Sequence, residues 1–176
     1  MQTFSSSFES RGALRKQAAV AAFVALCCVG VLGAALWEQS QGNAPCPLCI
    51  LQRIGYLGVL VFSMLSVWGA LARCARATRL TLALAALAGI GGLGVALKHV
   101  WLVWHPGQTC GLDPLAVQIN HWAITGLAPW MFRADGFCAD VPYLFGVSLP
   151  GWSALGFAGL VLALLVALRM TPRPVR

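Results

Sequence analysis

The stretch Ile50–Ala72, ILQRIGYLGVLVFSMLSVWGALA, contains a single charged residue, Arg53, close to its start. A helix needs about 20 predominantly apolar residues to cross the hydrocarbon core of a bilayer. The strands of membrane barrels show alternating apolar and polar residues, and this stretch does not alternate. Because backbone groups in lipid must be satisfied within the segment, the stretch predicts a transmembrane helix.

Three further apolar stretches predict the same structure: 18–37, 80–98 and 151–169. Hydrophobic residues make up 59% of the 176-residue chain and charged residues only 10%, whereas a soluble domain is about a quarter charged. Stretch 18–37 is longer than the apolar core of a signal peptide, which has about 7–15 residues. We therefore predict an all-α membrane protein, a four-transmembrane-helix bundle that forms a single domain over 1–176.

The basic residues indicate how the chain crosses the membrane. Nine of the 12 Lys and Arg residues lie before the first span, between the second and third, or at the end of the fourth. Since an excess of Lys and Arg marks the cytoplasmic side, we expect 1–17, 73–79 and 170–176 to be cytoplasmic. A short loop, 38–49, and a long loop, 99–150, then face outward. This placement explains the net charge of +7 without nucleic acid as a partner.

The long outward loop contains a candidate surface helix between Asp113 and Ile124. Asp113 suits a helix N-cap and Pro114 suits the first helical position. Apolar residues such as Leu115 and Ile119 form a stripe, so we expect the helix to lie along the membrane interface. The alternative is a loop packed on the top of the bundle.

Topology also separates the seven cysteines. Four lie in the outward loops: Cys46, Cys49, Cys110 and Cys138. Disulfides form and persist outside the cytoplasm, so these four can pair. The other three are expected to remain thiols, because Cys27 and Cys28 lie in the middle of a span and Cys74 lies at a cytoplasmic end.

Cys46-Pro-Leu-Cys49 is a CxxC pair. The same spacing occurs in zinc sites, but zinc would need Cys110 and Cys138 as further ligands, and these do not form a second CxxC. A bridge across so short a loop stabilises a fold little, so we interpret the pair as a redox dithiol and expect no metal. Cys110 and Cys138 could form a stabilising bridge worth about 3–4 kcal/mol, or exchange disulfides with the CxxC pair.

Arg53 follows Cys49 by four residues, so the two share one face of the predicted helix. Pro47 suits the first turn, which places Cys49 near the helix start. The helix dipole and the nearby cation there favour a thiolate. A permanent charge inside a span indicates a functional site; the alternative is an arginine whose side chain snorkels to lipid headgroups.

An enzyme that makes disulfides must pass on two electrons per bond. The sequence has no GxGxxG for a flavin or nicotinamide and no CxxCH for haem. A quinone dissolved in the bilayer is the acceptor that suits an apolar bundle with a thiolate and a cation at its rim. His99 is expected at a similar depth in the membrane to Arg53, where it could hydrogen-bond a quinone carbonyl or supply a proton. Alternatively, His99 is an ordinary interfacial histidine.

The chain resembles the DsbB family of bacterial inner-membrane thiol:quinone oxidoreductases. The resemblance covers nearly the whole chain and rests on four spans, PCPLCILQR at 45–53, KHVWLVW at 98–104 and FCAD at 137–140. It implies a multi-pass inner-membrane protein with both termini cytoplasmic and the redox loops periplasmic. Electrons would pass from the periplasmic oxidant DsbA to quinone, with ubiquinone preferred over menaquinone.

The resemblance also implies a role for each outward cysteine. Cys110 would form the mixed disulfide with DsbA. Cys46 would form a second mixed disulfide, between the two loops, with Cys138. Cys49 would be the thiolate next to quinone, with Arg53 and His99 as further quinone-binding residues. Gln52 departs from the family, whose members often have an acidic residue there.

Two other functions fit parts of the pattern. A vitamin K epoxide reductase-like oxidoreductase also uses a membrane CxxC and a quinone-type partner, although its CxxC lies in a late span. A membrane scaffold without enzyme activity would use the disulfides only to staple its outward loops.

Overall fold

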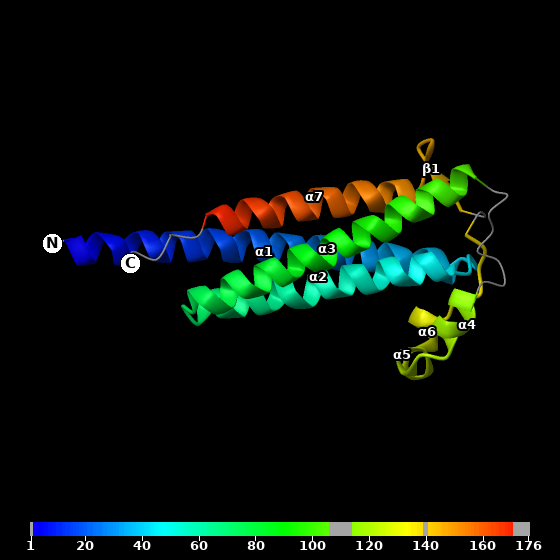
Figure 1. The fold of residues 1–176 in the computed structure, drawn as a ribbon, viewed down its shortest axis with the longest axis horizontal. Coiled ribbons are helices and arrows are strands. Elements are labelled where there is room, and N and C mark those ends of the chain that lie inside the picture. The colour runs from blue at the N-terminus through cyan, green and yellow to red at the C-terminus, as the bar shows by residue number, and fades with distance from the viewer. Residues whose placement is uncertain (1, 106–113, 139–140, 171–176) are drawn as a thin grey trace.

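The computed structural model describes residues 2–105, 114–138 and 141–170. Four long helices run side by side along the molecule (Figure 1). They are α1 Gln2–Ser40, α2 Pro47–Leu71, α3 Ala75–Trp104 and α7 Leu149–Arg169. Each contains a segment long and apolar enough to cross a membrane. The prediction of an all-helical protein with four long apolar helices is therefore confirmed.

The helices alternate in direction, so the start of α1 and the end of α7 lie at the same end of the bundle (Figure 1). The link between α2 and α3 is very short, and Arg73 within it has a positive φ of 57°. Helix α3 begins at Ala75, so most of the expected link 73–79 is helical.

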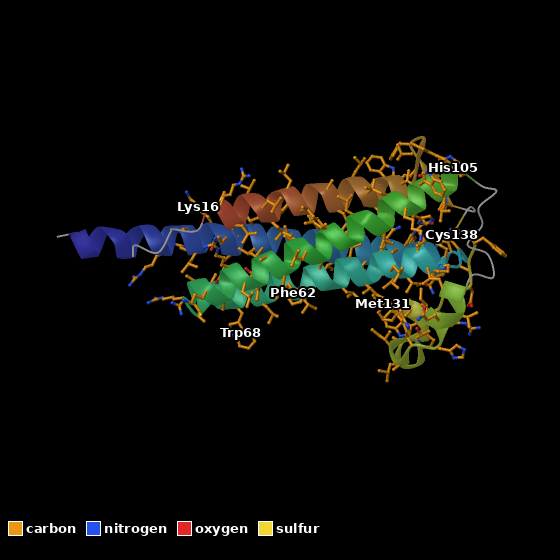
Figure 2. All side chains as sticks on the ribbon, in the orientation of Figure 1. Lys16, Phe62, Trp68, His105, Met131 and Cys138 are labelled. Carbon is orange, nitrogen blue, oxygen red and sulfur yellow. The ribbon has the colours of Figure 1, made fainter. Side chains whose placement is uncertain are left out.

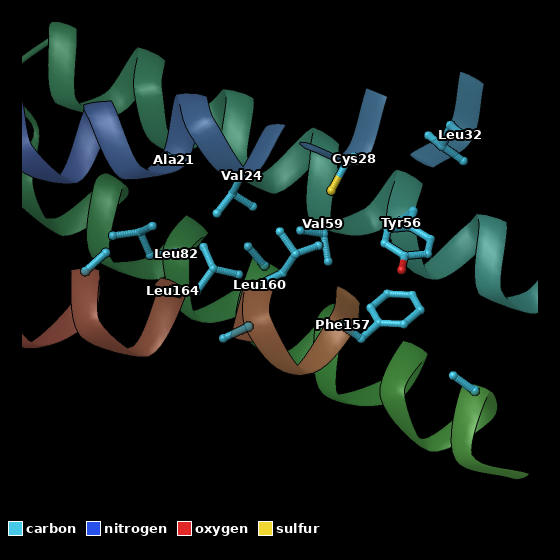
Figure 3. Packing of buried hydrophobic residues seen from close by; sticks show 14 of the residues in the cluster. Ala21, Val24, Cys28, Leu32, Tyr56, Val59, Leu82, Phe157, Leu160 and Leu164 are labelled. Carbon is cyan, nitrogen blue, oxygen red and sulfur yellow. The ribbon is translucent and has the colours of Figure 1, made fainter. Parts of the chain in front are cut away.

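The bundle core depends on glycines that let α2, α3 and α7 approach closely. A Cβ atom added to Gly92 of α3 would collide with the ring of Phe157 on α7. The Phe157 ring stacks on Tyr56 of α2 with ring centroids 4.0 Å apart (Figure 3). Tyr56 in turn donates a hydrogen bond of 3.1 Å to the Ser153 carbonyl. These contacts hold the three helices together at Tyr56, within ten residues of Cys46, the N-cap of α2.

Within its described residues, the long loop 99–150 contains three short helices and a hairpin. The helices are α4 Pro114–Asn120, α5 Ala123–Leu127 and α6 Pro129–Phe132, and the hairpin pairs β1 Tyr143–Leu144 with β2 Val147–Ser148. Helices α4 to α6 lie beside the end of the bundle where α2 begins (Figure 1). Ile119 and Phe132 of this loop form one buried cluster with Ile50 of α2. The long loop is therefore seated on the bundle.

The single helix expected between Asp113 and Ile124 is corrected by the structure. Helix α4 does begin at Pro114, but it ends at Asn120, and Ile124 belongs to α5; Asp113 lies outside the described residues. Asn120 exchanges two hydrogen bonds with the backbone of Ala134, at 2.9 and 3.1 Å. The Thr125 hydroxyl also donates to the Ile119 carbonyl at 2.7 Å. These polar contacts stabilise a turn where the apolar pattern alone predicts a continuous helix.

Candidate active site

The CxxC pair forms the first turn of α2. Cys46 is the N-cap, and its sulfur accepts a hydrogen bond of 3.3 Å from the backbone N–H of Cys49. Pro47 occupies the first turn, where a missing N–H costs nothing. The sulfur atoms are 3.0 Å apart, with the Cys46 thiol donating to Cys49. The pair is therefore present as a reduced dithiol, with Cys46 buried and Cys49 half-buried.

The environment separates the protonation states of the two sulfurs. The hydrogen bond to Cys49, burial and the negative charge of Cys49 together raise the pKa of the Cys46 thiol above its ordinary value. The raised pKa favours the proton on Cys46, so a negative charge on the reduced pair would lie on Cys49. A helix start suits that charge, because the free N–H groups and the helix dipole favour an anion there.

Arg53 is buried, with 6% of its surface exposed. Its Nη1 donates to the Oε1 of Gln39 at 2.7 Å and to the Met131 carbonyl at 2.8 Å. Its Nη2 donates to the Ala35 carbonyl at 3.0 Å. The guanidinium thus binds protein groups from α1 and α6 rather than extending to lipid headgroups.

All three of these partners are neutral. Within the described part of the chain, the only ion pair joins Arg133 to Asp135, at 2.8 Å, on the surface. Arg53 interacts electrostatically with Cys49 and, less strongly, with Cys46. A buried cation with neutral hydrogen-bond partners retains its full charge, so Arg53 is suited to stabilise an anion at Cys49.

His99 is fully buried and connects three parts of the site. Its Nδ1 is 3.0 Å from Nε2 of Gln52, and its Nε2 is 3.1 Å from the Cys138 carbonyl oxygen. Because a carbonyl only accepts, we assign the ring proton to Nε2, so that Nδ1 accepts from the Gln52 amide. Gln52, noted as a departure from the family pattern, therefore supplies the donor that this tautomer of His99 accepts.

Cys46, Cys49 and His99 also form a possible metal-ligand group, with ligand atoms within 4.8 Å of one another. A metal needs an unprotonated imidazole nitrogen. The nitrogen facing the sulfurs is Nε2, 3.7 Å from the Cys46 sulfur, and its proton is directed at the Cys138 carbonyl. The geometry of this donor set therefore suits thiol chemistry better than zinc.

Cys138 is buried and disulfide-bonded. It belongs to one apolar cluster with Cys46 and Leu48, and Figure 2 shows it at the same end of the bundle as Met131. The structure therefore brings Cys138 to the CxxC pair. Cys110 lies outside the described residues.

The segment before Cys138 is held against the segment before Cys46. The backbone N–H groups of Asp135 and Gly136 both donate to the Pro45 carbonyl, at 3.2 and 3.1 Å. A Cβ atom on Gly136 would collide with the carbonyl group of Ala44, so only glycine allows this approach. The glycine two residues before Cys138 is the sequence signal that could have indicated this contact.

The remaining cysteines lie away from this site. Cys28 is buried in the bundle core and Cys27 packs against that core, whereas Cys74 is exposed at the N-cap of α3. Gln39 and Met131, which hold Arg53, were not predicted from the sequence. Gln39 is an ordinary polar residue at the end of a span, and Met131 contributes only a backbone carbonyl.

Comparison with known proteins shows which proteins the chain is similar to. The sequence model of the family described as Disulfide bond formation protein DsbB matches residues 17–167. Disulfide bond formation protein B of Cupriavidus necator is 40% identical over 147 residues, which cover 82% of this chain and 88% of that protein. Its counterpart in Ralstonia nicotianae is also 40% identical, covering 82% and 89%. Disulfide bond formation protein B 1 of Pseudomonas savastanoi pv. phaseolicola is 34% identical over 164 residues, covering 90% and 95%.

Proposed function

Because the chain belongs to the DsbB family of disulfide bond formation proteins, we propose that it reoxidises a periplasmic DsbA-type dithiol oxidase and passes the electrons to membrane quinone. Membership implies a disulfide-generating oxidoreductase of the inner membrane and quinone use in general. The observation that best supports the finer pathway is the cluster of Cys138 with the CxxC pair, beside a buried arginine with neutral partners.

We propose that the chain is one integral membrane domain with both termini cytoplasmic. The boundaries that the sequence predicts, with outward loops at 38–49 and 99–150, place all four outward cysteines on the periplasmic side. Lys16, one of the basic residues expected to be cytoplasmic, lies away from the Cys138 end of the bundle (Figure 2). This separation of Lys16 from Cys138 supports the proposed orientation, because basic residues are enriched on the cytoplasmic side.

In the proposed pathway, a thiolate of the DsbA-type partner attacks Cys110 of a Cys110–Cys138 disulfide, and Cys138 leaves. The partner's second thiol then resolves the mixed disulfide, which releases oxidised partner and two reduced cysteines. Cys138 next attacks Cys46 of the oxidised CxxC pair, and Cys49 leaves as a thiolate. Cys110 displaces Cys46 from Cys138, so both electrons now reside on the Cys46–Cys49 dithiol.

A bound quinone would accept the two electrons and two protons of the Cys46–Cys49 dithiol, and the CxxC disulfide would form again. The residues present fit such an acceptor. Arg53 offers a buried positive charge that no described carboxylate neutralises, and Cys49 is the more exposed residue of the pair. Arg53 would bind an oxygen of the acceptor and hold Cys49 as the anion that reacts.

His99 has a second role in this proposal. In the structure its Nε2 proton is directed at the Cys138 carbonyl, so it holds the Cys138 segment over the CxxC pair. When that segment moves, the same N–H becomes available as a donor to a quinone carbonyl. His99 therefore remains a candidate quinone-binding residue.

The test is reconstitution in lipid nanodiscs with ubiquinone and a reduced DsbA-type partner. We expect thiol loss that depends on quinone, that ceases in a Cys49→Ser variant, and that is faster with ubiquinone than with menaquinone. A Cys74→Ser variant is the matched control and should behave as wild type, because Cys74 is exposed and lies at the N-cap of α3, at the other end of α2 from the CxxC pair. Thiol loss that is independent of quinone would refute the proposal.

The same preparation separates the alternatives. A scaffold with stapling disulfides would form no covalent adduct with the partner, whereas the proposed pathway gives a mixed disulfide at Cys110. Mass spectrometry of alkylated samples detects that adduct. A vitamin K epoxide reductase-like enzyme would instead oxidise its own thiols on reducing a quinone epoxide, which we expect this chain not to do.

A further inference from the structure

We propose that Gln39 is a positioning residue that fixes the Arg53 guanidinium without neutralising its charge. The inference rests on the proposed function, in which that charge stabilises the Cys49 thiolate. It assigns a role to a residue of α1 that lies outside the CxxC motif and its helix.

Gln39 supplies the shortest of the three hydrogen bonds on Arg53, at 2.7 Å. The other two acceptors are backbone carbonyls, of Met131 and Ala35. Gln39 is therefore the only side chain among these partners, and it is the position at which a substitution can change the environment of the guanidinium. It lies in the last turn of α1, so its bond also ties α1 to the start of α2.

The neighbouring residue shows why an amide matters at this position. Glu38 directly precedes Gln39, but its carboxylate accepts a hydrogen bond of 3.0 Å from the Asn43 side chain on the surface. The chain thus directs its carboxylate toward Asn43 and its amide to Arg53. A carboxylate at position 39 would form a partly buried ion pair with Arg53, and the positive field at Cys49 would fall.

An amide oxygen and a carboxylate oxygen are equally able to accept the Arg53 hydrogen bond, so they differ here mainly in charge. With Gln39, hydrogen bonding satisfies the guanidinium while its full charge acts on Cys49, the group with which it interacts most strongly. Substitutions of Gln39 can therefore test separately how the guanidinium is held in place and how its charge acts on Cys49.

Three variants test the proposal: Gln39→Glu, Gln39→Leu and the matched control Glu38→Gln. Each is made in a background that keeps Cys46 and Cys49 and replaces the other cysteines with serine. Ultraviolet thiolate absorbance of the reduced protein gives the fraction of Cys49 present as the anion. Quinone reduction, with substrate concentration varied, is measured in the wild-type cysteine background.

We expect Gln39→Glu to lower the ratio of Cys49 thiolate to Cys49 thiol at neutral pH by about tenfold, the effect that one neighbouring charge has on a thiol. Gln39→Leu should keep this ratio within about twofold but raise the KM for quinone at least fivefold, because the guanidinium keeps its charge and loses its anchor. Glu38→Gln should change neither quantity.

An unchanged thiolate fraction in Gln39→Glu would overturn the inference, as would an equal effect of Glu38→Gln. If Gln39→Glu does not fold, an unchanged KM in Gln39→Leu would overturn it. Wild-type protein that reduces no quinone would instead refute the proposed function, and the thiolate titration would still decide the role of Gln39.

Discussion

The His99 imidazole lies with its Nε2 3.7 Å from the Cys46 sulfur and 3.1 Å from the Cys138 carbonyl oxygen. One buried side chain of α3 therefore contacts both the CxxC pair and the loop segment that ends at Cys138. The exchange of a disulfide between the two pairs requires this proximity, and the first prediction concerns it.

We predict that His99→Ala reduces formation of the Cys46–Cys138 disulfide at least tenfold, because the Cys138 segment loses the donor that holds it. The measurement is the yield of that bond, by mass spectrometry, in protein whose Cys49 and Cys110 are replaced by alanine. His105→Ala is the control, since His105 is exposed and stacks on Trp101. Equal yields in the two variants would contradict the prediction.

The second prediction concerns Gly136, where any side chain would collide with Ala44. Gly136→Ala should lift the segment that precedes Cys138 and slow the internal exchange severalfold, with little change in the thermal stability of the bundle. Gly126→Ala is the matched control, because a Cβ atom there has no neighbour within 4 Å. The measurement is the rate of Cys46–Cys138 bond formation in the two variants. A wild-type rate in Gly136→Ala would contradict the prediction and show that the exchange tolerates displacement of this segment.

The third prediction follows from the raised pKa of Cys46. The hydrogen bond to Cys49 and the charge on Cys49 both favour the protonated Cys46 thiol, so Cys49→Ala should lower the Cys46 pKa. Cys46 would then be alkylated by iodoacetamide faster at neutral pH, and its rate would level off at a lower pH than in the wild type. Because Cys46 stays buried in both proteins, slower or unchanged alkylation would argue against this electrostatic coupling.

Much of the fold follows from local properties of the sequence. Hydropathy and length determine four long helices, since a segment such as 80–98 has no alternative in lipid. The short helix that starts at Pro114 was also predictable. Its end was not, because Asn120 and Thr125 form contacts with Ala134 and Ile119 that no periodicity encodes.

In the candidate site, too, local relations could be predicted from the sequence, whereas contacts between distant residues could not. The relation of Cys49 to Arg53 could be predicted, because a spacing of four residues puts both on one helix face. The partners of Arg53 could not, because Gln39 and Met131 are 14 and 78 residues distant from it in the chain. The same holds for His99, whose depth was expected but whose contact with Cys138 depends on how the long loop is seated.

The fourth prediction concerns Arg53 itself. Arg53→Lys keeps a positive charge but cannot reproduce a fork with three acceptors. Loss of charge-assisted hydrogen bonds worth about 1.5–3 kcal/mol each predicts at least a tenfold fall in quinone-dependent reoxidation. Arg133→Ala, which removes a surface ion pair, should retain wild-type activity. Full activity in Arg53→Lys would mean that charge alone is sufficient.

The central claim is that a Cys49 thiolate, stabilised by Arg53, lies in contact with quinone. The most direct test is the visible absorption spectrum of the purified, reduced protein during titration with ubiquinone. The account predicts a new absorption band from the thiolate–quinone contact, which is lost in Arg53→Ala and in Cys49→Ser but kept in Arg133→Ala. A wild-type protein without the band, or an Arg53→Ala variant that retains it, would contradict the account.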